Sequence, residues 1–327
     1  MKVSINSFLE PFGIQMKRTK SLNREQEYYQ GVISGAKGLY KIREEFQDQS
    51  FNTKIAGLAF SKDRPLQLHA LLTSYFNLVS NAVPIDVIYK ASSDQIDLFY
   101  NELAVELSNH PVRFIKEDNF YEQVVTWLKI QDADRIFFLT DDAVFLEEMD
   151  LNDCLNFNPL LQIFTVTHGR DLDYSFAFDR KQELPEFETI VNINGTIFLK
   201  WSWNNKLESP EWSYPLSVDS NIFSRKEMFE MCNNIQFKNP NSLEGGLQVF
   251  KDFFISRKGI CYTKVKMINV PCNVVQTDYA NRHTGLFTVE ELLNIWKQNK
   301  RIVTEDFYRQ NARDAMNSKY SFLEKEY

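Results

Sequence analysis

The chain lacks several features that would place it outside the soluble cell interior. No apolar run among its 327 residues approaches the ~18 residues that a membrane-spanning helix needs. Met1 to Glu10 lack the basic flank and apolar core of a secretory signal. The 4 cysteines are widely spaced and form no CxxC pair, which predicts buried thiols in a reducing compartment. We therefore expect a cytoplasmic protein.

Positive charge is also in short supply. Lys and Arg number 37 against 44 Asp and Glu, and the net charge of -7 argues against a general nucleic-acid binder. The chain has no Walker sequence and no GxGxxG, so neither an ATPase nor a dinucleotide enzyme is indicated. Its hydrophobic content of 43% is enough for a substantial core in one large domain or two smaller ones.

Between about residue 54 and residue 145, apolar runs of strand length alternate with patterns of helical spacing. The predicted strands are 55–60, 85–89, 112–115 and 135–139, and the predicted helices are 65–76, 95–107 and 121–130. This alternation predicts an α/β fold with a mostly parallel central sheet flanked by helices. Polar residues end each strand and are expected to gather along one edge of the sheet.

Helical extensions are predicted at both ends. Residues 1–50 are polar and read as helix over Leu22 to Phe46, and the α/β domain follows over 51–287. In the extension 288–327, Thr288 and Glu291 form a capping box for a helix to about residue 298, and a second helix is expected from about 304.

Aromatic and basic side chains on the predicted C-terminal helices have two alternative roles. Trp296, Lys297, Lys300 and Arg301 either dock on a membrane surface or another subunit, or belong to ordinary core packing. The oligomeric state is open.

The most informative stretch runs from Arg135 to Phe145, where a strongly apolar strand delivers Asp141 and Asp142. Carboxylates at the C-terminal end of such a strand lie where open α/β folds bind ligands. Two adjacent acids suit a hard divalent cation, which in turn holds a phosphate. The alternative is a plain turn, because Asp is common where strands end.

Further candidates lie at the ends of the other predicted strands. The turn from Ser61 to Pro65 leads into a helix N-terminus, which favours a phosphate. Arg64 is the better diphosphate partner there than Lys62, because a guanidinium makes two parallel hydrogen bonds. Asp94 and Asp118 end the second and third strands, and each either binds a base or ribose or caps the following helix.

Taken together, these segments resemble a bacterial GT-A glycosyltransferase, family 2-like, of the kind that builds surface polysaccharide or lipopolysaccharide. Such enzymes hold a metal and the diphosphate of a nucleotide sugar with an Asp-any-Asp motif. Thr140-Asp141-Asp142 occupies that place, with Thr in the first acidic position. Asn239 to Glu244 and Asn273 to Gly285 also resemble the family, and the resemblance covers roughly residues 54 to 287.

The resemblance implies roles for these residues. It implies Mn²⁺ or Mg²⁺ held by Asp142 and His283, since imidazole is a good ligand for Mn²⁺. It implies a nucleotide-binding half over 51–149 and an acceptor half over 150–287. The implied contacts with the nucleotide sugar are Ser61, Arg64, Asp94, Asp118 and Asp141. Because Thr140 departs from the motif, the dependence on metal is open.

The resemblance implies Glu244 as the catalytic base, and we expect this residue at the start of a helix. The alternative base is Asp219, which we expect just after an apolar strand. A base of this kind implies inversion at the anomeric carbon. Trp212 and Tyr214 are the candidates for stacking on the acceptor sugar, against the alternative that the tryptophans belong to the core.

The predicted function is transfer of a sugar from a nucleotide diphosphate donor to a hydroxyl of a glycan or lipid-linked acceptor, with no nucleic acid involved. Two alternatives remain. A nucleotidyltransferase would normally show a Gly-rich basic loop after the first strand, whereas Ser61 to Pro65 contains no glycine. A non-catalytic glycan-binding or scaffold protein would keep the fold without turnover. The donor base, the sugar and the linkage are open.

Overall fold

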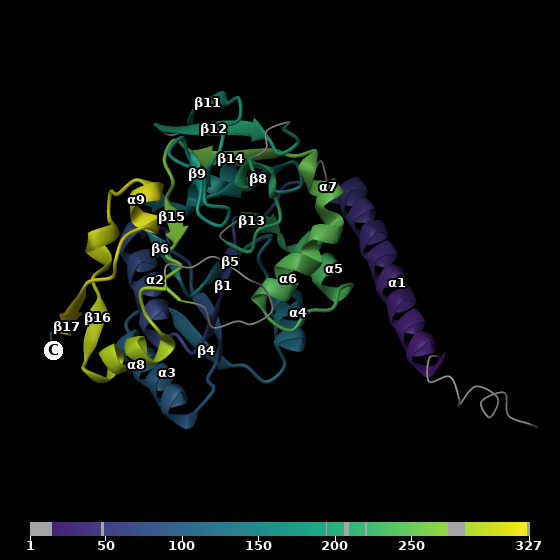
Figure 1. Cartoon of the computed structure of the whole chain (residues 1–327). Coiled ribbons are helices and arrows are strands. Elements are labelled where there is room, and N and C mark those ends of the chain that lie inside the picture. Colours follow the sequence, from purple (N-terminus) through teal and green to yellow (C-terminus); the bar gives the residue numbers. More distant parts are fainter. Residues whose placement is uncertain are drawn as a thin grey trace, which may run out of the picture.

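The computed structural model describes residues 15–46, 49–193, 195–205, 209–219, 221–273 and 285–325. A nine-stranded sheet runs through the molecule in the order β11-β12-β14-β8-β13-β5-β1-β3-β4 (Figure 1). Its strands are β1 (Ile55–Lys62), β3 (Ile85–Lys90), β4 (Val112–Lys116), β5 (Arg135–Thr140), β8 (Gln162–Thr165), β11 (Glu188–Ile193), β12 (Thr196–Ser202), β13 (Asn221–Ser224) and β14 (Lys258–Tyr262).

The predicted α/β class with a mostly parallel sheet is confirmed. Strands β5, β1, β3 and β4 pair in parallel, as the regular alternation of the first half predicts. Only β12 and β13 run against the others in this sheet of the described chain. The antiparallel β13 joins β5 to the second half, so residues from both halves meet near the end of β5.

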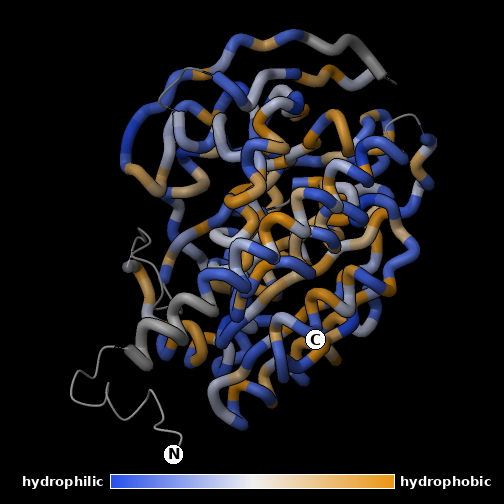
Figure 2. Tube along the Cα trace, turned by 90° about the vertical axis from the view of Figure 1, so that its right-hand side faces the viewer, coloured by the Kyte–Doolittle hydropathy of each residue, from blue (hydrophilic) through white to orange (hydrophobic). Residues whose placement is uncertain are grey.

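Helices cover both faces of the sheet. The α-helices are α1 (Gln15–Phe46), α2 (Pro65–Leu78), α3 (Asp94–Glu106), α4 (Phe120–Ile130), α5 (Arg225–Asn233), α6 (Pro240–Leu247), α7 (Lys251–Ile255), α8 (Val289–Lys297) and α9 (Ala312–Met316). Contacts join α2 to α3 and α8, and α4 to α5, and the two groups lie on opposite sides of the sheet (Figure 1). Figure 2 shows hydrophobic segments in the middle of the molecule and hydrophilic ones toward the outside.

The alignment of β1 with β5 positions the later site. Both strands are apolar and almost wholly buried, which suits the interior of a parallel sheet. Phe60 lies opposite Thr140 in their register, so Ser61 and Asp141 leave the sheet side by side. Pro65 then occupies the first turn of α2, as predicted from its fixed φ and missing N–H.

The long helix α1 forms despite its three glycines, because two of them allow close packing. A Cβ on Gly31 would lie 2.4 Å from the carbonyl oxygen of Asn234, next to the end of α5. A Cβ on Gly35 would lie 2.7 Å from the ring of Phe250. The helical reading of Leu22 to Phe46 therefore holds, and α1 lies along the flank of the molecule beside α5 (Figure 1).

The C-terminal extension departs from the predicted pair of helices. α8 begins with the predicted capping box of Thr288 and Glu291. The expected second helix is only a short 3₁₀ turn, η6 (Thr304–Phe307), because the backbone is already extended at Tyr308, and the short helix α9 follows. The strands β16 (Lys300–Ile302) and β17 (Phe322–Glu324) pair nearby.

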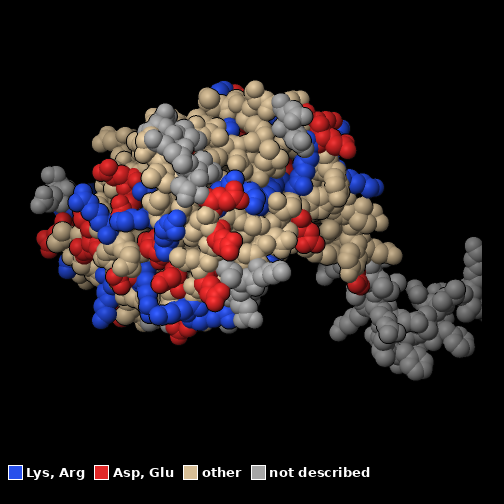
Figure 3. Space-filling model, turned by 90° about the horizontal axis from the view of Figure 1, so that it is seen from above, with Lys and Arg blue, Asp and Glu red and all other residues tan. Residues whose placement is uncertain are grey.

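On the face seen from above, basic and acidic side chains are interspersed without a large field of one sign (Figure 3). None of the helices within the described ranges combines the length and apolar character needed to cross a bilayer. All four cysteines are buried and free, as predicted.

Glu106 anchors the C-terminal extension to α2 and α3. Its side chain is only 10% exposed and makes ion pairs with Arg301 at 2.7 Å, His69 at 3.1 Å and Lys325 at 3.3 Å. Trp296 is also buried, and its indole N–H donates to Glu102. Trp296 and Arg301 therefore serve internal packing, which corrects the membrane-docking alternative for both.

We expect Glu106→Gln to destabilise the protein by about 3 kcal/mol, because it leaves a buried guanidinium without its counter-charge. Burial raises the pKa of Glu106, but His69 and Arg301 outweigh burial and hold that pKa below its ordinary value. The ionised Glu106 therefore stabilises the folded protein at pH values above its ordinary pKa of 4.5, and this stabilisation is lost as the pH falls below 4.5. Urea unfolding at pH 7 and pH 4 measures both effects. Asp132→Asn, which disrupts an exposed ion pair with Lys54, is the control and should change neither.

Candidate active site

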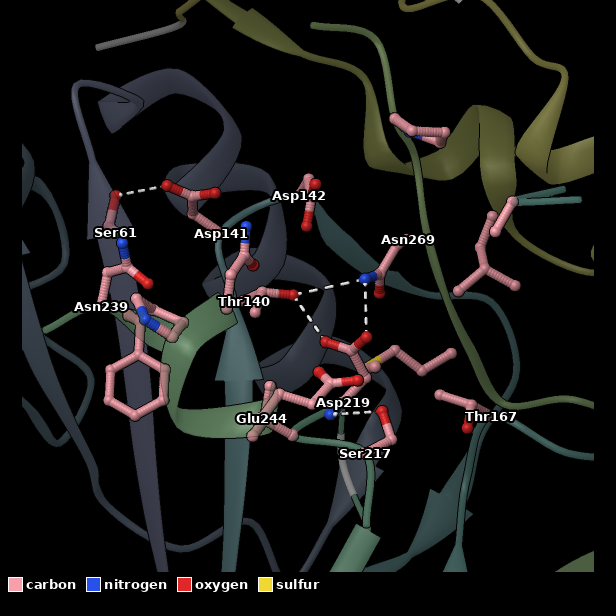
Figure 4. A pocket seen from close by; sticks show the side chains of 18 of the residues that line it. Ser61, Thr140, Asp141, Asp142, Thr167, Ser217, Asp219, Asn239, Glu244 and Asn269 are labelled. Atoms are coloured by element: carbon pink, nitrogen blue, oxygen red, sulfur yellow. Dashed lines mark hydrogen bonds between the residues drawn. The ribbon is translucent and has the colours of Figure 1, made fainter. Parts of the chain in front are cut away.

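A cavity of about 830 Å³ opens at the carboxyl ends of β1, β3 and β5, and the loops of the second half form its other wall. Most of the residues that the sequence singled out line it. The predicted residues in the lining are Ser61, Arg64, Asp141, Asp142, Tyr214, Asp219 and Glu244. Figure 4 shows the acidic side chains converging from β5, α6 and the loop before β13.

Asp141 is held entirely by the protein. Its carboxylate accepts hydrogen bonds from the hydroxyl of Ser61 at 2.9 Å, the backbone N–H of Lys62 at 3.1 Å and Nη1 of Arg64 at 2.9 Å. The hydroxyl of Tyr100 meets that of Ser61 at 2.7 Å. Asp141 therefore fixes the turn after β1 rather than offering free oxygen atoms to a ligand.

Arg64 lies between the two motif acids. Its Nη1 is 3.3 Å from Asp142, and its Nη2 donates to the backbone carbonyl of Asn273 at 2.6 Å. Burial lowers the pKa of Arg64, but Asp141 and Asp142 outweigh burial, and the net shift is upward. The guanidinium is a permanent cation there, while Asp142 keeps 20% of its side chain exposed on the cavity wall.

Asp219 is fixed from two sides. The hydroxyl of Thr140 donates to its Oδ1 at 2.8 Å, and Nδ2 of Asn269 donates to its Oδ2 at 3.0 Å (Figure 4). Burial and the negative charge of Asp142 raise the pKa of Asp219 to about 6, against these two hydrogen bonds.

Glu244 lies beside Asp219 in the same cavity (Figure 4). Burial is the main cause that raises the pKa of Glu244 to about 8, and the charge of Asp219 adds to it. The nearby Tyr214 hydroxyl and the Val218 backbone act in the opposite direction and lower the pKa of Glu244. A carboxyl with a pKa near working pH is suited to general acid–base chemistry.

Both candidate bases lie in secondary structure that differs from the prediction. Glu244 lies inside α6 and not at a helix start, because Asn239 caps that helix and Pro240 opens it. Asp219 precedes β13 and does not follow a strand, since 216–219 is turn and bend. Both residues nevertheless reach the cavity.

Trp212 is not an acceptor-stacking residue. Trp201, Trp203 and Trp212 are at most 1% exposed and surround the ring of His168, which stacks on Trp201. The indole N–H of Trp212 donates to the carbonyl of Leu172. The alternative reading of these tryptophans as core is confirmed, whereas Tyr214 does line the cavity.

Asp94 and Asp118 do not reach the described cavity lining. Both are exposed, and neither caps a helix, because Ser93 caps α3 and Asn119 caps α4. Asp94 is the first residue of α3, and Asp118 lies two residues beyond the end of β4. At that part of the wall the lining contains Lys90 and its ion-pair partner Glu117.

Of the two predicted metal ligands, the structure describes only one. Asp142 is available on the wall, and His283 lies outside the described residues. Across the described chain, no three His, Cys, Asp or Glu side chains cluster as a ligand set. Asp142 and Asp219 both lie on the wall, and a divalent cation there would offset their negative charge.

Asn269 and Asn273 were missed by the sequence reasoning. Asn269 ends β15 (Met267–Asn269), which pairs with β6 (Ala143–Phe145) directly after the motif acids. It is 50 residues from Asp219 in sequence, and no local pattern relates the two. Asn273 is buried on the cavity wall, and its carbonyl binds Arg64.

No protein-family model matches the chain. Its sequence is similar to the bifunctional glycosyltransferase pgtA of Dictyostelium discoideum, at 23% identity over 287 residues, which cover 78% of this chain and 36% of that protein. The chain thus spans about a third of the length of the curated relative that it matches.

Solved structures give weaker likenesses. TarS from S. aureus in complex with UDP-GlcNAc has 13% identity and a TM-score of 0.41, covering 72% of this chain and 61% of that one. A nucleotidyl transferase from Methanothermobacter has 10% identity and a TM-score of 0.37, covering 65% of this chain and 89% of that one. TM-scores this low do not establish a shared function.

Burial of Glu244 should lower stability at high pH. Its raised pKa means that the folded protein holds a proton that the unfolded chain releases above the ordinary pKa of 4.5. The destabilisation therefore grows from pH 4.5 to about 8 and then levels off. We expect Glu244→Gln to raise stability at pH 9 by roughly 2 kcal/mol and to have little effect at pH 4.5.

Thermal and urea unfolding at both pH values measure this difference. Glu44→Gln, at an exposed position on α1, is the matched control and should show none. A Glu244→Gln variant that gains no stability with rising pH would contradict the raised pKa of Glu244.

Proposed function

We propose that the protein is a GT-A-like glycosyltransferase that moves a sugar from a nucleotide diphosphate donor to a hydroxyl of a glycan or lipid-linked acceptor. The observation that carries the proposal is a cavity that holds Asp142 at the strand edge together with the carboxyl of Glu244, which projects from α6. The similarity in sequence to a glycosyltransferase supports it.

The donor diphosphate would occupy the strand edge next to the N-terminus of α2. Helix N-termini attract phosphate, and Arg64 adds a fixed positive charge that Asp141 holds in place. Asp142 would bind a Mn²⁺ or Mg²⁺ ion that in turn binds the diphosphate oxygens, with His283 a predicted second ligand. Such a metal neutralises charge on the leaving diphosphate.

The acceptor would enter beside Tyr214 and Glu244. In its ionised form Glu244 takes the proton of the acceptor hydroxyl as that oxygen attacks the anomeric carbon, and the bond to the diphosphate breaks with inversion. The raised pKa of Glu244, about 8, leaves its carboxyl mostly protonated at pH 7 in the empty cavity. The transfer rate should therefore rise with pH toward about 8.

Nucleotide binding is the first test. Calorimetric titration with UDP, GDP, CMP and dTDP, each with and without Mn²⁺, should reveal tight, metal-enhanced binding of one of them. Asp142→Ala should abolish this binding, because it removes the carboxylate on the exposed wall. Asp118→Ala is the control, since Asp118 lies outside the described lining, and it should bind as the wild type does. No binding of any nucleotide would overturn the proposal and favour the scaffold alternative.

Transfer itself tests the base. Glu244→Gln should lower the rate at least ~100-fold, the usual contribution of general-base catalysis, while nucleotide affinity stays within a few-fold of wild type. Release of the nucleoside diphosphate from the matching nucleotide sugar measures the rate. An unchanged rate in Glu244→Gln would exclude Glu244 as the base. Release of pyrophosphate from a nucleoside triphosphate and a sugar phosphate would instead indicate the nucleotidyltransferase.

A further inference from the structure

Both carboxylate oxygens of Asp219 are engaged by side chains on two different strands. Thr140, at the end of β5, donates to Oδ1 at 2.8 Å, and Asn269, at the end of β15, donates to Oδ2 at 3.0 Å. Nδ2 of Asn269 also lies 3.4 Å from the Thr140 hydroxyl, which closes the network. The backbone N–H of Asp219 donates to Ser217. Few side chains on the cavity wall are fixed so completely.

Glu244 is held differently. It projects from α6 into the cavity beside Asp219 (Figure 4). Tyr214, which is half-buried, lines the same cavity. Of the two acids, Asp219 is therefore the one that is tied to the strand ends, and Glu244 approaches it from α6.

The threonine in the motif suits this arrangement. A carboxylate at position 140 would face Asp219 where the hydroxyl of Thr140 now lies at 2.8 Å, and two anions at that distance repel. A hydroxyl instead donates a hydrogen bond to the ionised Asp219. The threonine at position 140 and the acid at position 219 thus belong to one hydrogen-bonded feature.

We propose that Thr140 and Asn269 are positioning residues that hold Asp219 as a fixed anion beside Glu244, so that Asp219 tunes the base and is not itself the base. This inference rests on the proposed function, in which Glu244 is the proton acceptor. It assigns separate roles to two acids that the sequence left as rivals.

The charged groups around the pair agree with this division. Asp219 is faced by Asp142 from β5 and by Glu211 from the loop before it, and Glu244 by Asp219 and Glu211. The two hydrogen bonds lower the pKa of Asp219 against burial, whereas Glu244, without such strand anchors, has the higher pKa. At pH 7 the pair therefore carries its charge mainly on Asp219.

The test is a titration of side-chain carboxyls by NMR in the full-length protein labelled with ¹³C-Asp and ¹³C-Glu. Loss of a signal in Asp219→Asn and in Glu244→Gln assigns the two resonances. Thr140→Val should raise the midpoint of Asp219 by about one pH unit, since one hydrogen bond to the ionised form is lost. Asp219→Asn should lower the midpoint of Glu244 by a similar amount, because a neighbouring negative charge is removed.

Two matched variants separate this role from general disruption. Thr140→Ser keeps the hydroxyl and should leave the Asp219 midpoint near wild type. Thr167→Val makes the same isosteric change elsewhere on the cavity wall, where the hydroxyl bonds to Thr165 and His168, and should move neither midpoint. If Thr140→Val does not fold, Asn269→Ala removes the other anchor and should also raise the midpoint of Asp219.

If the titration midpoint of Glu244 is the same in Asp219→Asn as in the wild type, the inference is wrong. It is also wrong if the Asp219 midpoint moves in neither Thr140→Val nor Asn269→Ala. Both readouts are independent of nucleotide binding, so failure of the proposed function, seen as no nucleotide binding by the wild type, is a separate result.

Discussion

The site depends on one constraint, the parallel alignment of β1 with β5. The pairing of Phe60 with Thr140 brings Ser61 and Asp141 to the same level, so the turn after β1 and the acids after β5 share one edge. Asp141 then joins the two ends by accepting from Ser61, Lys62 and Arg64. Without that ion pair the buried Arg64 would keep only its longer contact with Asp142, at 3.3 Å, and the turn that leads into α2 would lose its anchor.

The second half of the chain reaches this edge through β13. Because β13 runs antiparallel next to β5, the loop before it ends beside Thr140, and Asp219 arrives there. The strand β15 pairs with β6 and brings Asn269 to the same point. Segments distant in sequence are thus fixed against the motif by rigid strands, which is the placement that a precise site needs.

The sequence predicts the parts of this site that local patterns encode. The apolar run before Asp141 gives a buried strand, and Pro65 gives the start of α2, because both signals lie within a few residues. Local patterns do not predict the role of Asn269, because its hydrogen bond to Asp219 joins residues that are 50 positions apart in the sequence. They do not predict the burial of Trp212 either, since an aromatic pattern is the same whether the ring packs in a core or on a sugar.

Burial of Glu244 is a disadvantage to the fold that the proposed chemistry explains. A carboxyl removed from water destabilises the folded protein once the unfolded chain would ionise, and a glutamine or an apolar residue there would avoid the penalty. The protein instead retains Glu244 next to a second anion, Asp219, that raises its pKa further. Strained or destabilising groups persist where function needs them. An acid whose pKa is raised to about 8 beside a large polar cavity is therefore better explained by proton transfer than by packing.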